Sequence, residues 1–150
     1  MACRYPHGPV PVIRQFIRLA RAAAEYRETT GRHLNVYGVL GELYGALVWG
    51  ISLHRKENVI GSDGRRGKDH VEIKTIGPRS TTDRVQVKLS GNFNKLLVVK
   101  IVENRDDEMA SGFHMTGRMI DRSDLTTARS GNAGIARSRA CRIGEGPPAV

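Results

Sequence analysis

The chain has 150 residues, 39% of them hydrophobic, which suits one domain with a buried core and is too short for two. Lys and Arg number 24 against 15 Asp and Glu, and this net charge of +9 favours an anionic partner, most often nucleic acid. Aromatic residues make up only 5%, which argues against base stacking as the main binding mode. No apolar run is long enough for a membrane span or a signal core. The chain has two cysteines, and their positions form neither a disulfide framework nor a CxxC motif. A reducing cytoplasm is therefore expected, without membrane association.

The N-terminal part predicts an extended segment followed by helices. Residues 1–12 contain Pro6, Pro9 and Pro11 and are expected to form an extended lead-in. Apolar residues then recur at helical spacing, which predicts a helix over 13–29 that stops at Gly31. Arginines line another face of this helix, and they fit either a solvated face or a stripe that contacts phosphate: Arg14, Arg18 and Arg21.

A second helix is predicted from a cap at Asn35 to Trp49, with an apolar stripe along one side. Glu42 lies on the shoulder of that stripe, where a carboxylate is costly unless it has a partner. Glu42 therefore fits either a functional site or a partly exposed helix charge.

The stretch 58–76 predicts a β-hairpin that gathers charged residues. Alternation over 71–76 places Glu72 and Lys74 on one face of a strand. The Gly-rich and charged segment 61–69 is expected to be the turn, with Asp63 at the end of the preceding strand. Basic residues crowd this turn, which favours contact with a phosphate backbone or, alternatively, a plain solvated turn: Arg65, Arg66 and Lys68.

Asp63, Glu72 and Lys74 together suggest a chemistry. Two carboxylates with waters and carbonyls form a hard oxygen site that suits Mg²⁺. A lysine beside such a metal can position a water and help to deprotonate it, which phosphodiester hydrolysis requires. The alternative is that Glu72 and Lys74 form a solvated ion pair on an exposed strand.

The rest of the chain predicts a sheet and a tail. After a loop over 77–83, the strand 84–89 alternates, with Gln86 and Lys88 outward, expected beside Glu72 and Lys74 on one sheet face. A short connection precedes the most apolar run, which predicts a buried central strand that can pair in parallel. The remaining expectations are a strand, a short helix and a loosely ordered basic tail: 112–119, 121–128 and 130–150.

At these residues the sequence resembles the PD-(D/E)xK nuclease superfamily over roughly 35–101. Asp63 matches the first acidic residue, Glu72-Ile73-Lys74 matches (D/E)xK, and Ser62 stands in place of the proline. The resemblance implies an α/β (α+β) fold with a restriction-endonuclease-like mixed central β-sheet flanked by helices. It also implies Mg²⁺, or Mn²⁺, held by Asp63 and Glu72, with Glu42 facing the metal and Gln86 or Lys88 close to it.

Three hypotheses about function follow for a single domain over 1–129. The first is a Mg²⁺-dependent endonuclease that hydrolyses DNA phosphodiester bonds, and cleavage of both strands favours a homodimer. The second is a non-catalytic module of the same fold that binds DNA or another nucleic acid. The third is a small basic interaction protein whose charge lies mostly in the tail.

Overall fold

The computed structural model describes residues 5–56, 61–104, 112–127 and 133–137. The helices are α1 (Val10–Thr30), α2 (Tyr37–Trp49) and the short 3₁₀ helix η1 (Arg122–Asp124). The strands are β1 (Ser52–Leu53), β2 (Gly64–Arg66), β3 (Asp69–Ile76), β4 (Arg84–Lys88), β5 (Lys95–Glu103), β6 (Phe113–Asp121), β7 (Thr126–Thr127) and β8 (Ala133–Arg137). Within the described ranges, this places the chain in the α+β class.

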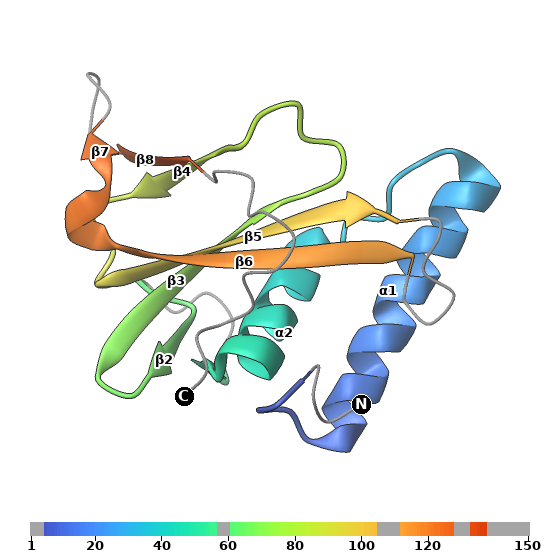
Figure 1. Cartoon of the computed structure of the whole chain (residues 1–150), viewed down its shortest axis with the longest axis horizontal. Coiled ribbons are helices and arrows are strands. Elements are labelled where there is room, and N and C mark those ends of the chain that lie inside the picture. Colours follow the sequence, from blue (N-terminus) through green and yellow to red (C-terminus); the bar gives the residue numbers. More distant parts are fainter. Residues whose placement is uncertain (1–4, 57–60, 105–111, 128–132, 138–150) are drawn as a thin grey trace.

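The strands form a five-stranded sheet with the order β1-β2-β3-β5-β6 and a three-stranded sheet with the order β4-β8-β7. Strands β3 and β5 are parallel, whereas β1–β2, β2–β3 and β5–β6 are antiparallel. The large sheet is therefore mixed, as predicted, and the apolar run that forms β5 is its buried, parallel-paired strand. In Figure 1 the long strands β5 and β6 run across the middle of the molecule, between α2 and the small sheet.

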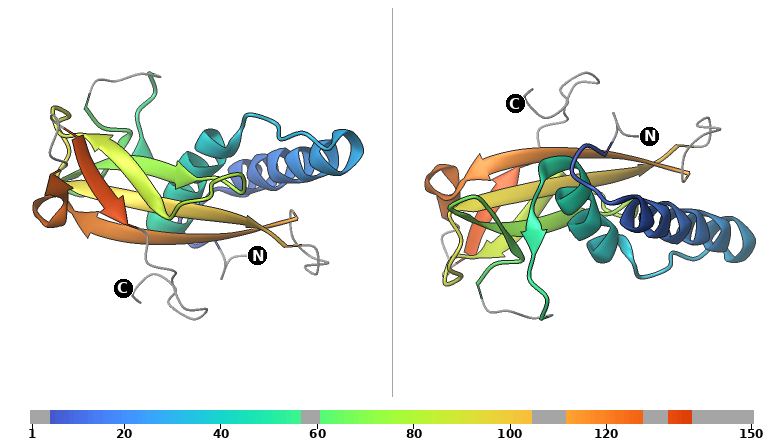
Figure 2. Two further views of the ribbon diagram at one scale, coloured as in Figure 1. Left: turned by 90° about the horizontal axis from the view of Figure 1, so that it is seen from above. Right: turned by 90° about the horizontal axis from the view of Figure 1, so that it is seen from below.

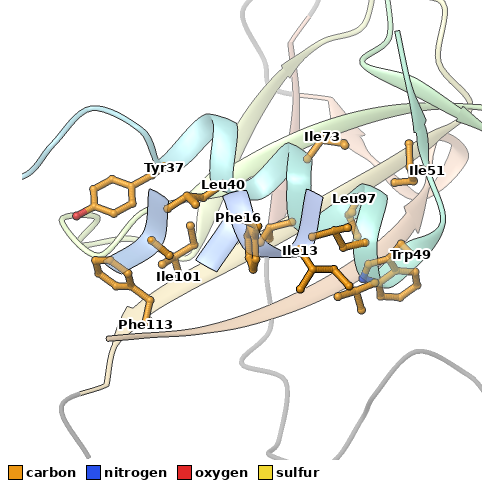
Figure 3. Close-up of a cluster of buried hydrophobic side chains, with 14 of the residues drawn as sticks. Ile13, Phe16, Tyr37, Leu40, Trp49, Ile51, Ile73, Leu97, Ile101 and Phe113 are labelled. Carbon is orange, nitrogen blue, oxygen red and sulfur yellow. The ribbon is translucent and has the colours of Figure 1, made fainter. Parts of the chain in front are cut away.

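The helices cover one face of the large sheet. Alternate residues of β3 and β5, among them Ile73 and Leu97, pack in one core cluster with residues of α1 and α2. Figure 3 shows this cluster, in which Phe16 of α1 and Leu40 of α2 lie over Leu97 and Ile101 of β5. The period of two along each strand puts the intervening residues on the opposite face.

The small sheet covers that opposite face. Val85 and Val87 of β4 pack with Leu96 and Val98 of β5 in a second buried cluster that also contains Ile76. Figure 2 shows β4 and β8 crossing over one end of the large sheet, away from α1. The prediction of a central sheet flanked by helices therefore holds for one face only, because a second sheet occupies the other.

Helix α1 begins earlier than predicted. It starts at Val10, so the expected extended lead-in is wrong for 10–12. Proline is tolerated in the first helical turn, where its missing N–H has no intrahelical acceptor, and Pro11 lies in that turn. Gly31 ends the helix with φ 69°, and its N–H donates to the carbonyl of Arg27.

Helix α2 lies close to β3 because two of its glycines face the sheet. A Cβ on Gly41 would lie 1.9 Å from Oγ1 of Thr75, and one on Gly45 would lie 3.0 Å from Cδ1 of Ile73. The helix begins at Tyr37 with Val36 as its N-cap, so the predicted cap at Asn35 is wrong by one residue. Close packing thus offsets the intrinsic cost of glycine in a helix.

Two predictions near the C-terminus are corrected. The short helix expected over 121–128 is a single 3₁₀ turn followed by β7. Within the segment predicted to be a loose tail, β8 pairs with both β4 and β7. These partners are distant in sequence, so a local pattern of Gly and Arg does not reveal the pairing. The remainder of the predicted tail lies outside the described residues.

Across the residues that the structure describes, none of the helices combines the length and the apolar character that crossing a membrane requires.

Candidate active site

The β2–β3 hairpin carries the predicted site, but its turn is shorter than expected. Arg66 pairs with Asp69, so the loop is only Gly67 and Lys68. Gly67 has φ 60°, which suits the first position of a tight two-residue hairpin loop. The predicted turn over 61–69 is therefore wrong. Charged residues can form β2 because this short strand needs no apolar side chains on its exposed face. Contrary to the expectation, Asp63 lies just before β2 and does not end an earlier strand.

A β-bulge positions Asp63. Gly64 is the partner of Val71 in the strand register, and the N–H of Asp63 also donates to the carbonyl of Val71 at 2.9 Å. Asp63 and Gly64 thus both lie opposite Val71, and two residues opposite one is the definition of a bulge. Oδ2 of Asp63 accepts a hydrogen bond of 2.6 Å from the N–H of Ile73. The carboxylate therefore takes the place of a main-chain acceptor where β2 leaves β3.

Glu72 and Lys74 lie on the face of β3 that is opposite α2. Nζ of Lys74 is 2.6 Å from Oε1 of Glu72, and their side chains are 37% and 17% exposed. Across β5, their register partners are Leu96 and Val98, both buried beneath the small sheet. The pair thus lies at the boundary between an apolar layer and solvent, where a charge interaction is screened less than on an open surface.

The electrostatic environment of Asp63 joins it to this pair. Burial raises the pKa of the Asp63 carboxyl above its ordinary value, the Ile73 N–H lowers it, and the negative charge of Glu72 raises it further. Lys74 and His54 act in the opposite direction on the same pKa. The hairpin therefore brings Asp63, Glu72 and Lys74 within electrostatic range of one another, with the carboxylate of Asp63 partly desolvated.

This donor set fits some metals better than others. No group of three or more His, Cys, Asp and Glu side chains within the described segments could hold a metal ion. A closed zinc site needs four such ligands, and calcium takes six to eight oxygens. Mg²⁺ is commonly held by one or two carboxylates, with waters and substrate phosphates completing its shell. Asp63 and Glu72 would supply those two carboxylates.

Glu42 is half-buried on α2, the helix that packs on the Ile73 face of β3. The residues whose charges act on the Asp63 carboxyl are Glu72, Lys74 and His54. Glu42 is not one of them, although it does have an interaction partner of its own. Its predicted place in the site remains a prediction.

The basic residues of the hairpin are spread along it. Arg65 is exposed, and its Nη2 lies 3.3 Å from Nε2 of His70 on the neighbouring strand. The guanidinium of Arg66 lies over the ring of Trp49 at 5.8 Å. Lys68 is exposed in the turn. Arg65 and Lys68 thus place positive charge on the exposed surface of the hairpin.

Gln86 and Lys88 are not where the sequence placed them. Both are exposed on β4, and Val85 and Val87 between them are buried, so the predicted alternation is confirmed. However, β4 belongs to the small sheet, and its buried residues face the large sheet. Gln86 and Lys88 therefore point away from Glu72 and Lys74. The expectation that the four residues share one sheet face is wrong, because β4 leaves the plane of β3.

His54 is a neighbour of Asp63 that the sequence did not single out, and it contacts Ser62, the residue in place of the motif's proline. Nε2 of His54 is 3.1 Å from Oγ of Ser62, whose residue is only 6% exposed. The N–H of His54 donates to the carbonyl of Asp63 at 3.0 Å. The sequence signal was weak, since His54 lies nine positions before Asp63 in a segment without strong periodicity.

The loop before β5 is hydrogen-bonded to the start of β3. The side chain of Asn94 accepts from the N–H of His70 at 2.7 Å and donates to Oδ1 of Asp69 at 2.6 Å. Arg122 holds the same loop by donating to three carbonyls, those of Leu89, Gly91 and Phe93. The start of β3 is thus fixed by side chains that no local pattern reveals.

Comparisons with protein-family models, with curated proteins and with solved structures gave no match for this chain.

Proposed function

We propose that this protein is a Mg²⁺-dependent nuclease that hydrolyses DNA phosphodiester bonds at the β2–β3 hairpin. The observation that carries the proposal is the position of the partly desolvated Asp63 carboxylate, which accepts a hydrogen bond from the N–H of Ile73, the residue between Glu72 and Lys74. Acidic pairs beside a lysine, partly removed from solvent, recur in sites whose groups must bind a cation or move a proton. Mn²⁺ is the alternative ion for the same oxygen donors.

In this proposal Asp63 and Glu72 hold the metal, which would neutralise the charge that develops on the phosphate. The hydrogen bond from Ile73 fixes one oxygen of Asp63 and leaves Oδ1 as the natural donor to a cation. Lys74 is bound to Glu72, so a cation on Glu72 would release its ammonium group. That group could then orient the attacking water or stabilise the departing oxygen.

Charge supports DNA as the substrate. The chain has a net charge of +9, and Arg65, Lys68 and His70 lie on the hairpin next to the acidic pair. Basic side chains that contact phosphates position a duplex without reading its sequence. Gln86 and Lys88 face away from the hairpin and would contact nucleic acid only at a separate surface. In the same proposal, Glu42 would bind a second metal ion or a water. Cleavage of both DNA strands would need two active sites, which a homodimer would supply.

The second candidate function is binding of nucleic acid without catalysis. The ion pair between Lys74 and Glu72 favours it, because a lysine that neutralises a carboxylate weakens that carboxylate as a metal ligand. For either candidate we infer a cytoplasmic location, which rests on the absence of any disulfide pattern in the sequence.

A cleavage assay separates the two candidates. Purified protein is incubated with supercoiled plasmid and short duplexes, with Mg²⁺, with Mn²⁺ and with EDTA. The nuclease proposal expects cleavage with either metal and none with EDTA, and no cleavage by Asp63→Asn. The Asp124→Asn variant, at an exposed aspartate of η1, is the matched control and should cleave like the wild type. Salt-dependent DNA binding without metal-dependent cleavage would instead identify a binding module.

A further inference from the structure

A polar groove of about 560 Å³ lies at the far end of β3 from the hairpin. Its walls come from the last turn of α1, the loop between α1 and α2, the loop that follows β3, and the end of β5. Ile76 lies two residues beyond Lys74 and four beyond Glu72 on β3, roughly 7 and 13 Å along the strand. Asp63, Glu72 and Lys74 do not line the groove, so it is distinct from the candidate active site. Its volume falls within the range of about 300–1,000 Å³ that is usual for small-molecule sites.

The position of the groove in the fold favours ligand binding. Strands β3 and β5 are parallel neighbours, and their carboxyl ends meet at this edge of the sheet. After Ile76 the chain leaves for β4 in the small sheet, whereas β5 continues to Glu103 and pairs with β6 in the large sheet. A crevice at the carboxyl ends of neighbouring parallel strands, where the following segments diverge, is the common ligand position in open α/β sheets.

Two of the cations in the groove are held by weak ion pairs. Nε of Arg27 is 3.5 Å from Oε1 of Glu103, and Nζ of Lys100 is 2.6 Å from Oδ1 of Asp83. The four side chains are between 28% and 48% exposed, and exposed ion pairs stabilise a fold only weakly. An anionic ligand can therefore replace Glu103 or Asp83 as the partner of these cations at little cost.

A tight turn beside the groove carries another cation, Arg79. Ser80 donates its N–H to the carbonyl of Gly77 at 3.0 Å, which closes a β-turn with Pro78 at its second position. The hydroxyl of Ser80 also donates to the carbonyl of Thr82 at 2.9 Å and so fixes the continuation of the loop. Arg79 occupies the third position of this turn and is exposed. Arg79 does not itself line the groove, but the turn holds it near enough for its positive charge to act on His33, which does.

His33 lines the groove from the α1–α2 loop. Its Nδ1 is 2.6 Å from the hydroxyl of Tyr37, and the two rings meet edge to face with centroids 5.7 Å apart. Burial lowers the pKa of His33, and the positive charges of Arg27 and Arg79 lower it further against the opposing effect of Glu103. Arginines from two separate elements therefore create a positive field at one ring.

We propose that this groove binds a small phosphate monoester, whose phosphate is contacted by Arg27, Arg79 and His33. Two guanidinium groups from different elements suit the several oxygens of a phosphate, which accept paired N–H groups. Ser80 and Thr81 line the same groove, and the hydroxyl of Thr81 can bond to the polar remainder of the ligand. This assignment does not depend on nuclease activity.

Anion binding is measured in EDTA, so that no metal contributes. Inorganic phosphate, a nucleoside 5′-monophosphate and the unphosphorylated nucleoside are titrated while the imidazole NMR signals of His33 are followed. Both phosphates should shift these signals saturably and raise the pH at which His33 titrates, whereas the nucleoside should leave them unchanged. Arg79→Gln should weaken phosphate binding by about tenfold, as loss of one charge-assisted hydrogen bond does. Arg118→Gln, an exposed arginine on β6, is the matched control and should bind normally.

Several outcomes would overturn the assignment. One is the absence of any saturable shift at His33, and another is equal affinity of Arg79→Gln and Arg118→Gln. Equal affinity for the nucleoside and its monophosphate would show that the groove does not recognise the phosphate. A short DNA duplex that shifts His33 in an Arg79-dependent manner, when both small phosphates fail to do so, would assign the groove to nucleic acid instead. Loss of cleavage in Asp63→Asn bears only on the nuclease proposal, since Asp63 takes no part in the groove.

Discussion

Nζ of Lys74 lies 2.6 Å from Oε1 of Glu72 on the face of β3 that is opposite α2. Residues two apart on a strand share a face, so this pair follows directly from the Glu-x-Lys spacing. The contact has opposite consequences for the two candidate functions. In a nuclease, a cation bound to Glu72 would free Lys74 for the reaction. In a binding module, Lys74 would only neutralise the charge of Glu72.

Replacement of Lys74 by alanine separates these roles. In the nuclease proposal, Lys74→Ala leaves Mg²⁺ affinity unchanged or higher but lowers cleavage by ~10²-fold or more, as loss of a positioned proton-transfer group does. Plasmid cleavage and calorimetric Mg²⁺ titration of the same sample measure the two effects. If Lys74 were only an ion-pair partner, its loss would cost at most about 1 kcal/mol of stability and leave any cleavage unchanged.

Asp63→Asn is expected to abolish cleavage and to raise the stability of the folded protein at neutral pH. The pKa of Asp63 is raised in the folded state, so the folded protein holds this proton more tightly than the unfolded chain. The associated stability is present below the ordinary value of 3.8 and is lost as the pH rises through the folded-state pKa. At neutral pH the ionised carboxylate therefore destabilises the fold, and asparagine keeps an acceptor for Ile73.

Thermal unfolding of the wild type and Asp63→Asn, measured in EDTA at pH 3 and pH 7.5, checks this expectation. The variant should gain in melting temperature only at the higher pH. Added Mg²⁺ should then stabilise the wild type alone, because a ligand that binds only the folded state raises its stability. A variant that is less stable at pH 7.5 would mean that the charged hydrogen bond to Ile73 outweighs burial.

The sequence anticipated the features that local period determines. Alternation identified β3 with Glu72 and Lys74 on one face, and the continuous apolar run identified the buried strand β5. Both follow from the geometry of a single strand, in which side chains alternate and a doubly covered strand needs apolar residues on both faces. The α+β class follows from the same patterns.

Features that depend on distant partners were not anticipated. The hairpin turn was predicted too long, because the charged residues Arg65 and Arg66 show no strand period over three positions. The second sheet was missed because β8 lies in a stretch of Gly and Arg and pairs with β4 some fifty residues earlier. For the same reason Gln86 and Lys88 were placed on the wrong sheet.

The glycines of α2 give a matched pair of stability predictions. A Cβ on Gly41 would lie 1.9 Å from Oγ1 of Thr75, so Gly41→Ala must displace the Thr75 side chain or move α2 away from β3. We expect a loss of roughly 1–3 kcal/mol, as for other overpacked core positions. Gly38→Ala meets no atom within 4 Å and should instead stabilise the helix, by up to about 1 kcal/mol. Urea unfolding of both variants measures the difference, and equal effects would contradict this packing.

Stability should fall on mild acidification because of His33. Its pKa is lowered from the ordinary value of 6.5 in the folded protein, so the unfolded chain binds this proton more readily. The contribution of His33 is therefore complete above pH 6.5 and is lost as the pH falls through the folded-state pKa. His33→Gln should flatten the dependence of the unfolding free energy on pH between 7 and 5. The exposed His114 provides the control, and an equal flattening in His114→Gln would disprove the assignment to His33.

Paramagnetic NMR tests the proposed metal site most directly. Mn²⁺ added at substoichiometric amounts broadens amide signals near the place where it binds, and Mg²⁺ competes with it for the same oxygens. We predict that the signals of Ile73 and Gly64 broaden first, that Mg²⁺ restores them, and that Asp63→Asn shows no such broadening. Broadening centred elsewhere, such as at Asp121 and Asp124, or broadening at the hairpin that survives Asp63→Asn, would contradict a metal site at Asp63 and Glu72.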